Sequence, residues 1–327
     1  MTTSTILSDN GASSGSSGIK TSGGNDGTLV IQTTTAGGTA TTAQTIGTDQ
    51  VTTFAQPANL PNTFGFKNRL INGRMDINQR GLTGPTSGYF VDRWQVSGVS
   101  STSLQTSGLP TGYTQAVSIN RTSAAGTAIL YQNIESKNIV DLVGQVVTVS
   151  FLAKNVSGVG SITVSLSYAN ASDNFSGVTS IQTVTASSSP SGSWASYTAT
   201  FNALPANAAN GLQVNINAVI ASTGTLEVTG AQLEKGTAAT SFDFRSYGTE
   251  LALCQRYFQQ FGGTYTYEYI GDCICASGTS AYAGISLVTT MRAAPSFSYT
   301  GSASDFTTDA GNTNTQCTAL TLNNSAT

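Results

Sequence analysis

Apolar and polar side chains alternate along one segment after another between residues 88 and 235, and this alternation restricts that part of the chain to β-structure. In residues 160–168, Ile162, Val164 and Leu166 alternate with serine and threonine. Such a strand buries one face and leaves the other in water. The segments with this signal are 89–97, 115–121, 128–135, 145–155, 160–168, 181–186, 193–202, 212–220 and 225–234. Turn-forming clusters separate them, so we predict a jelly-roll-like β-sandwich.

The segment 249–262 has helical spacing instead. Leu251, Cys254 and Phe258 fall on one face of a helix, and Thr249 is suited to cap its N-terminus. Glycines at 262–263 can end it with a left-handed residue. We therefore expect one short helix directly after the sandwich.

These patterns divide a mainly β chain into three parts. Residues 1–56 carry only four charges among Gly, Ser and Thr and have too little apolar surface for a core, so this segment is either disordered or ordered by assembly with other chains. Residues 57–245 hold the sandwich. Residues 246–327 hold the helix and a smaller C-terminal β domain, which either continues past Thr327 or has its last edge completed by another chain. The strands expected in this domain are 281–290, 296–300 and 317–322.

Composition limits the chemistry. The chain has no histidine, so a Ser-His-Asp or Cys-His arrangement is excluded, as is the commonest metal ligand. Only 9% of residues are charged and the net charge is −3, which argues against a nucleic-acid binder. The sixteen acidic residues are scattered, and the four cysteines are expected to be free thiols. We expect no enzymatic activity, no cofactor, no metal site and no membrane insertion.

Several stretches resemble one known family. They are GAQLEKG at 230–236, CQRYF at 254–258, NRLINGRMDINQRG at 68–81, DRW at 92–94 and MRAAP at 291–295. In this order and context they resemble the virion surface proteins of tailed bacteriophages, especially tail fibres whose sandwich is like a carbohydrate-binding module. The matches frame most of the chain, from about residue 66 to 296.

This resemblance implies a structural virion protein, most simply a tail fibre in a tail appendage, made in the host cytoplasm and involved in host attachment. It favours residues 1–56 as an N-terminal stalk that binds other virion tail proteins. It also implies a homo-oligomer, with a homotrimer as the expected state, and a receptor that is a host cell-surface glycan or protein. Two alternatives stay open: a capsid decoration or head fibre protein, and a glycan-degrading tailspike.

Two sets of aromatic residues are candidate receptor or glycan contacts, because an aromatic face offers an apolar platform to a sugar ring. Trp194 is out of phase with the apolar face of its predicted strand, although covering the end of the sandwich is the favoured alternative. Tyr265, Tyr267 and Tyr269 line one face of another short segment and could instead pack on the helix or a sister chain.

Four basic residues gather in residues 64–81, with Asp76 as the one acid among them. They are Lys67, Arg69, Arg74 and Arg80. They form either a docking patch for an anion or a partner, or a structural set that bridges backbone carbonyls and neighbouring chains where the stalk enters the sandwich. The structural interpretation is favoured.

Overall fold

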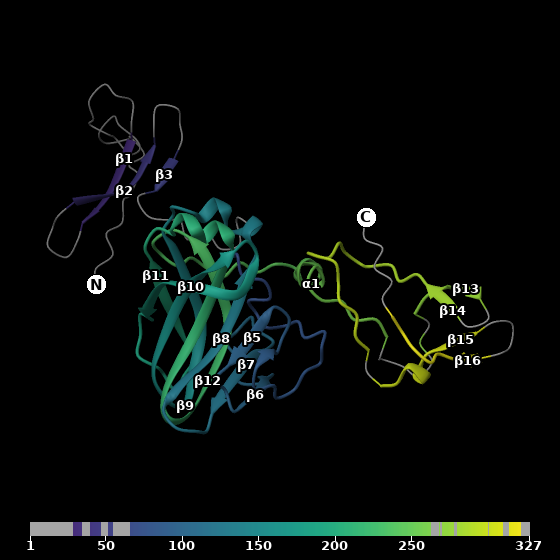
Figure 1. Ribbon diagram of the computed structural model, residues 1–327. Helices are drawn as coiled ribbons and strands as arrows, with labels where there is room; N and C mark the ends of the chain where they lie inside the picture. Colours follow the sequence, from purple (N-terminus) through teal and green to yellow (C-terminus); the bar gives the residue numbers. More distant parts are fainter. Residues whose placement is uncertain are drawn as a thin grey trace, which may run out of the picture. The chain divides into compact units, whose positions relative to one another are not determined.

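The computed structural model describes residues 29–34, 40–46, 52–54, 66–262, 268, 270–277, 280–299, 301–309 and 314–321 (Figure 1). The chain divides into two compact units, residues 1–60 and 61–327. In the first unit three antiparallel strands form a small sheet: β1 (Leu29–Thr34), β2 (Ala40–Ile46) and β3 (Thr52–Phe54). The rest of the predicted stalk, residues 1–56, lies outside the described residues.

The second unit contains the predicted sandwich, built as one nine-stranded sheet that curls into two layers. Two long strands, β9 (Val147–Ala171) and β12 (Leu212–Lys235), run through both layers and pair with each other. The first layer also contains β6 (Ser101–Gln105), β7 (Ala116–Arg121) and β11 (Ala195–Phe201). The second also contains β4 (Gly88–Tyr89), β5 (Trp94–Ser97), β8 (Gly126–Ile134) and β10 (Asn174–Thr185).

The prediction that the following segments are separate strands is wrong. The segments 145–155 and 160–168 join in β9, and the segments 212–220 and 225–234 join in β12. Each pair is continuous, because glycines let the ladder bend instead of ending. Gly158 has φ +64°, and a Cβ there would lie 1.9 Å from the Thr223 carbonyl oxygen. Only glycine allows the two bends to pass so closely.

Other predicted boundaries also shift. The predicted strand 89–97 is interrupted at residues 90–93, where Arg93 takes φ +72° and the Phe90 N–H donates to the Trp94 carbonyl at 3.0 Å. The strand β6 has no counterpart in the prediction, because its sequence, STSLQ, is almost wholly polar.

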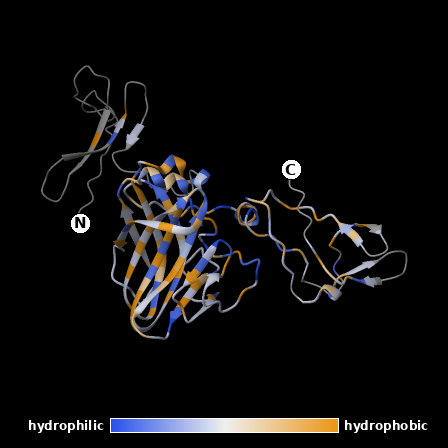
Figure 2. Ribbon diagram, viewed as in Figure 1, coloured by the Kyte–Doolittle hydropathy of each residue, from blue (hydrophilic) through white to orange (hydrophobic). Residues whose placement is uncertain are grey.

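The core lies between the layers, where hydrophobic residues alternate with hydrophilic ones along the strands (Figure 2). Phe90, Trp94 and Phe201 are fully buried there. The rings of Phe151 and Tyr197 stack with their centroids 5.7 Å apart. The Tyr197 hydroxyl accepts the Ser191 N–H at 2.8 Å, so this buried tyrosine also fixes a loop.

Helix α1 (Tyr247–Gln255) follows the sandwich, as predicted, but it begins three residues earlier and ends six residues earlier than a helix capped by Thr249 and ended by the glycines at 262–263. Ser246, not Thr249, is the N-cap. The helix stops at Gln255 because the side chains of Tyr257 and Phe258 pack against arginines of other segments. The short 3-10 helices are η1 (Ser136–Asn138), η2 (Val140–Leu142), η3 (Ala206–Asn210) and η4 (Ala303–Asp305).

The C-terminal part contains two hairpins, β13 (Cys273–Ser277) with β14 (Ser280–Ala283), and β15 (Thr307–Asp309) with β16 (Asn314–Gln316). The predicted strands are therefore wrong at 284–290, 296–299 and 317–321, because these segments have no strand to pair with in the described part of the chain. None of the described side chains from Phe261 onward is buried. No described helix is long and apolar enough to cross a membrane.

Candidate functional site

The chain enters and leaves the sandwich at one place, the junction, formed by residues 66–81, 92–94 and 230–258. Asn72 organises its entry side with φ +57°. The Asn72 amide donates to the Ile77 carbonyl at 2.8 Å and to the Asp92 carbonyl at 2.9 Å. The indole N–H of Trp94 donates to the Asn72 carbonyl at 2.9 Å. One buried asparagine thus closes the entry loop onto the segment before β5.

Two more buried amides attach the entry segment to the sheet. The Gln132 side chain in β8 accepts the N–H of Ile71 and donates to its carbonyl, both at 2.8 Å, as a neighbouring strand would. The Asn68 amide donates to the Ala231 carbonyl at 3.0 Å, and its oxygen accepts the Leu233 N–H at 3.0 Å. The entry segment therefore follows the edge of β12 beyond the point where β7 stops pairing with it.

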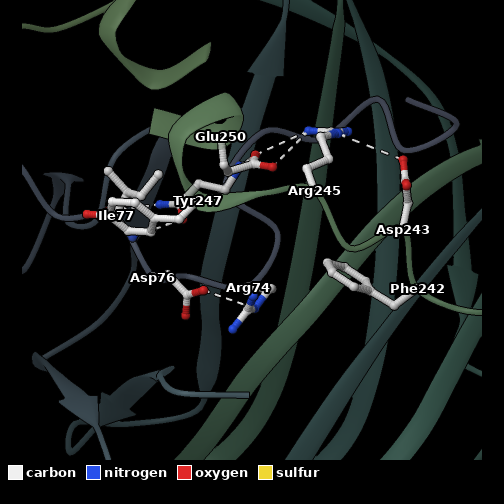
Figure 3. Close-up of a pocket in the computed structure, with 9 residues that line it drawn as sticks. Arg74, Asp76, Ile77, Phe242, Asp243, Arg245, Tyr247 and Glu250 are labelled. Atoms are coloured by element: carbon white, nitrogen blue, oxygen red, sulfur yellow. Dashed lines mark hydrogen bonds and ion pairs between the residues drawn. The ribbon is translucent and has the colours of Figure 1, made fainter. Parts of the chain in front are cut away.

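A pocket opens on the exit side of the junction (Figure 3). Arg245 crosses it, with Glu250 on one side at 3.1 Å and Asp243 on the other at 3.8 Å. Arg74 lies 2.9 Å from the carboxylate of Asp76. Each acid of the pocket is thus engaged by an arginine. The full lining is Asn72, Arg74, Asp76, Ile77, Phe242, Asp243, Arg245, Tyr247 and Glu250.

Beneath the helix end lies Asp92, whose side chain is 1% exposed. It accepts the backbone N–H of Gln79 at 3.0 Å and also the Gln79 side-chain amide. Burial raises the pKa of Asp92, opposed by the bonds from Gln79 and the charge of Arg80. Burial likewise lowers the pKa of Arg80. Asp92, Gln79 and Arg80 therefore hold the entry segment to the residues before β5 in an environment from which water is largely excluded.

The predicted basic group lies at the junction, and its charges have partners within the chain. Lys67 donates to the Thr240 hydroxyl and, at 2.5 Å, to the Ser241 carbonyl. Arg69 pairs with Asp141. Both residues thus hold the entry segment to other parts of the second unit.

The other two members stack as well as pair. Arg74 pairs with Asp76, while the guanidinium of Arg80 lies 3.8 Å from the centroid of the Phe258 ring and 3.7 Å from the Asp92 carboxylate. Partial burial of these groups reduces the charge presented to an outside anion. A docking role for this basic group stays a prediction.

Of the four candidate aromatic contacts, the structure describes only Trp194. Trp194 lies just before β11, half-buried, and its indole N–H donates to the Gly108 carbonyl at 2.7 Å. Its role as a contact stays a prediction. Tyr265, Tyr267 and Tyr269 lie outside the described residues.

A second candidate surface, which we call the amide face, covers the outer side of the second layer. Six strands contribute to this layer: β4, β5, β8 and β10, together with residues 159–171 of β9 and 212–220 of β12. None of these segments contains Asp, Glu, Lys or Arg. Most outward positions carry amides and hydroxyls, half-buried where neighbours pack side by side, with Ile129 and Val219 as apolar exceptions. The amide face consists of Gln95, Tyr131, Asn133, Ser165, Gln213 and Asn215.

From the alternation in 160–168 and 212–220, Ser165, Gln213 and Asn215 are predicted to face water, whereas Gln95, Tyr131 and Asn133 were not singled out. The available signal was the complete lack of charge along those strands, which differs from the first layer, where Lys154, Glu227 and Glu234 occur. Among the described residues no group of three His, Cys, Asp or Glu side chains could hold a metal ion.

No family model matches the chain, and no curated protein matches it. Solved structures with similarity include the enzymatically active domain of tailspike protein 4 of bacteriophage CBA120, at 12% identity and a TM-score of 0.36, covering 52% of this chain and 21% of that one. The chain thus spans about a fifth of the length of that domain.

Carbohydrate-binding modules also occur among these structures. One is a CBM4, at 19% identity and a TM-score of 0.34, covering 50% of this chain and 97% of that chain. Another is the CBM22-1 xylan-binding domain from Paenibacillus barcinonensis, at 14% identity and a TM-score of 0.33, covering 53% and 96%. At these values the likeness assigns neither a ligand nor an activity to this chain.

Proposed function

We propose that this chain is a non-catalytic structural protein of a tailed bacteriophage virion, most simply a tail fibre that takes part in host attachment. One observation carries the proposal: the segments that resemble the phage family are the segments that interlock at the junction. Residues 68–81 and 92–94 bind 230–236 through buried amides and backbone bonds, and 254–258 closes over them.

The last of the resembling stretches, MRAAP at 291–295, meets the same place. The Arg292 N–H donates to the Arg256 carbonyl at 2.9 Å, directly after the helix. Motifs separated by up to about 220 residues are thus parts of one structural device. The stretches that carry the resemblance are thus in contact with one another in this fold, which supports reading them together.

The fibre is proposed to be a homo-oligomer, with the trimer expected from the resemblance. Support comes from the C-terminal part, where Ile274 is 76% exposed, Tyr282 58% and Val288 69%. Ile274 and Tyr282 face each other across the β13–β14 hairpin. Apolar side chains in this number, with no buried described residue near them, are suited to burial against sister chains.

The test is placement in the particle. Antibodies against the sandwich should label tail appendages of intact phage in electron micrographs, and deletion of residues 1–56 should abolish incorporation while leaving a folded sandwich. Label on the capsid would establish the head-fibre alternative. Release of reducing sugars from host polysaccharide by the purified protein would establish the tailspike alternative. Absence from purified particles would refute a virion role.

A further inference from the structure

The amide face forms two adjacent cross-strand rows. One row joins Gln95, Tyr131, Asn215 and Ser165, which are direct partners across β5, β8, β12 and β9. The other joins Asn133 to Gln213. Neighbouring strands lie about 4.8 Å apart, so the longer row spans about 14 Å. This is the length of a few linked sugar residues.

Lateral hydrogen bonds fix these side chains in place. The Tyr131 hydroxyl donates to the Gln95 amide oxygen at 3.2 Å, and the Gln213 amide donates to the Asn133 amide oxygen at 2.9 Å. The Asn215 amide donates to the Ser165 hydroxyl at 3.1 Å. Held in this way, the amides lose little conformational entropy when a ligand binds.

The same bonds leave both kinds of hydrogen-bonding group unused. Within the described part of the chain, Gln95 Nε2 and Asn133 Nδ2 have no acceptor, and Gln213 Oε1 and Asn215 Oδ1 have no donor. Each sugar hydroxyl both donates and accepts, so it can engage either kind. The Tyr131 ring offers an apolar surface between the amides.

Charge selects among ligand classes. A nucleic acid or an acidic glycan would require unpaired basic groups, and the strands of this layer contain no Lys or Arg. Arg80, which lies over the ring of Tyr89 next to Gln95, is paired with Asp92.

A second protein copy would normally bury an apolar centre. The Tyr131 ring is the only large apolar group among the six residues, and the outward Ile129 and Val219 lie farther along β8 and β12, opposite the polar Asn217 and Thr127. The remaining match is a ligand that is rich in hydroxyls and carries no charge.

We propose that the amide face binds a neutral oligosaccharide. The proposal deepens the host-attachment role and rests on it for its biological setting. It assigns contact to strand residues of the second layer, separate from Trp194 and the tyrosines of 265–269.

The experiment uses the full-length protein and an array of unbranched oligosaccharides. The neutral probes are built from glucose, galactose, mannose and N-acetylglucosamine, and the anionic probes contain uronic acid or phosphate. We expect binding to at least one neutral probe. Its affinity should change less than about twofold between about 50 and 500 mM NaCl, because screening has no charge to act on.

Replacing Asn133 and Gln213 together by alanine should weaken binding at least about tenfold, since two hydrogen bonds of about 1 kcal/mol each are lost. Asn133→Asp keeps the shape of the side chain while removing its donor, and should act in the same direction. The matched control is Gln105→Ala, an amide on β6 in the other layer that donates to Ser103 at 3.0 Å. Melting temperatures check that each variant is folded.

The proposal would be overturned if the protein bound none of the neutral probes or bound only the anionic ones. It would also be overturned if the folded variants bound as tightly as the parent. A variant that changes only the oligomeric mass would assign the face to a second copy and also overturn it. Failure of the virion role is distinguishable, because a protein absent from particles could still bind the neutral probe.

Discussion

Arg245 Nη1 lies 3.1 Å from one carboxylate oxygen of Glu250 and 3.2 Å from the other, in an ion pair whose arginine side chain is 4% exposed. The same guanidinium donates to the carbonyls of Asn68 and Leu70. Glu250 in turn accepts the backbone N–H of Asn72. This pair therefore joins the first turn of α1 to the entry segment.

Replacing Arg245 by alanine should lower the free energy of unfolding by about 3–5 kcal/mol, because Glu250 and Asp243 lose their buried counter-ion. Lysine should recover only part of this loss, since an ammonium group cannot reproduce the planar fork. Urea unfolding at neutral pH measures both. The exposed Lys137→Ala is the control, expected within about 0.5 kcal/mol of the parent. An Arg245→Ala loss below about 1 kcal/mol would contradict this role.

Gly73→Ala should destabilise the protein by several kcal/mol, because the new Cβ would lie 2.2 Å from the Ala231 carbonyl oxygen, a backbone atom that cannot move aside cheaply. Gly248→Ala is the matched control. It lies in α1 with open space around it, so it should be neutral or stabilise by about 0.4–1 kcal/mol. Thermal unfolding of the two variants tests the contrast, and equal melting temperatures would disprove the close approach at Gly73.

Replacing Tyr257 by Phe should make the stability of the protein less sensitive to alkaline pH. Burial raises the pKa of Tyr257 from its ordinary 10.0 to about 12. The folded state therefore keeps a proton that the unfolded state loses, so this contribution to stability is complete below pH 10 and falls as the pH rises toward about 12. The Phe variant keeps the ring under Arg93 and should lose less stability between pH 9 and about 11.5. Parallel melting curves over this range would exclude the effect.

Replacing Ile274 and Tyr282 together by serine should reduce self-association of the full chain, because these exposed residues share one side of a hairpin. Light scattering over a range of protein concentrations measures the mass. The control is Leu82→Ser, an exposed apolar residue of the sandwich unit. A mass that falls equally in both variants, or in neither, would place the interface elsewhere.

The sequence was sufficient for local features. The alternation in 212–220 predicts a strand with Val214 and Ile216 inward, and both are buried. It was insufficient where the structure depends on distant partners. The Asn68 bond to Ala231 joins residues 163 positions apart, and no local pattern marks it. The early end of α1 has the same origin, because Tyr257 and Phe258 are held by Arg93 and Arg80.

The amide face shows a different limit. Its residues could be named as outward-facing from alternation alone, but their lateral pairing depends on strand register. A shift of one residue in β12 would turn Gln213 and Asn215 inward. The register is set by long-range pairing of β8, β9 and β12, so the rows become visible only in the fold.

The junction also determines how the molecule would carry mechanical force. The Arg69 N–H donates to the Leu233 carbonyl and the Ala231 N–H to the Gly73 carbonyl, both at 2.9 Å, so incoming and outgoing chain are tied directly to each other. Tension applied along the chain would pass through this short crossing at the C-terminal end of β12 and largely bypass the other strands. The rest of the sandwich would carry little load, and its outer surface could change in sequence without weakening this crossing.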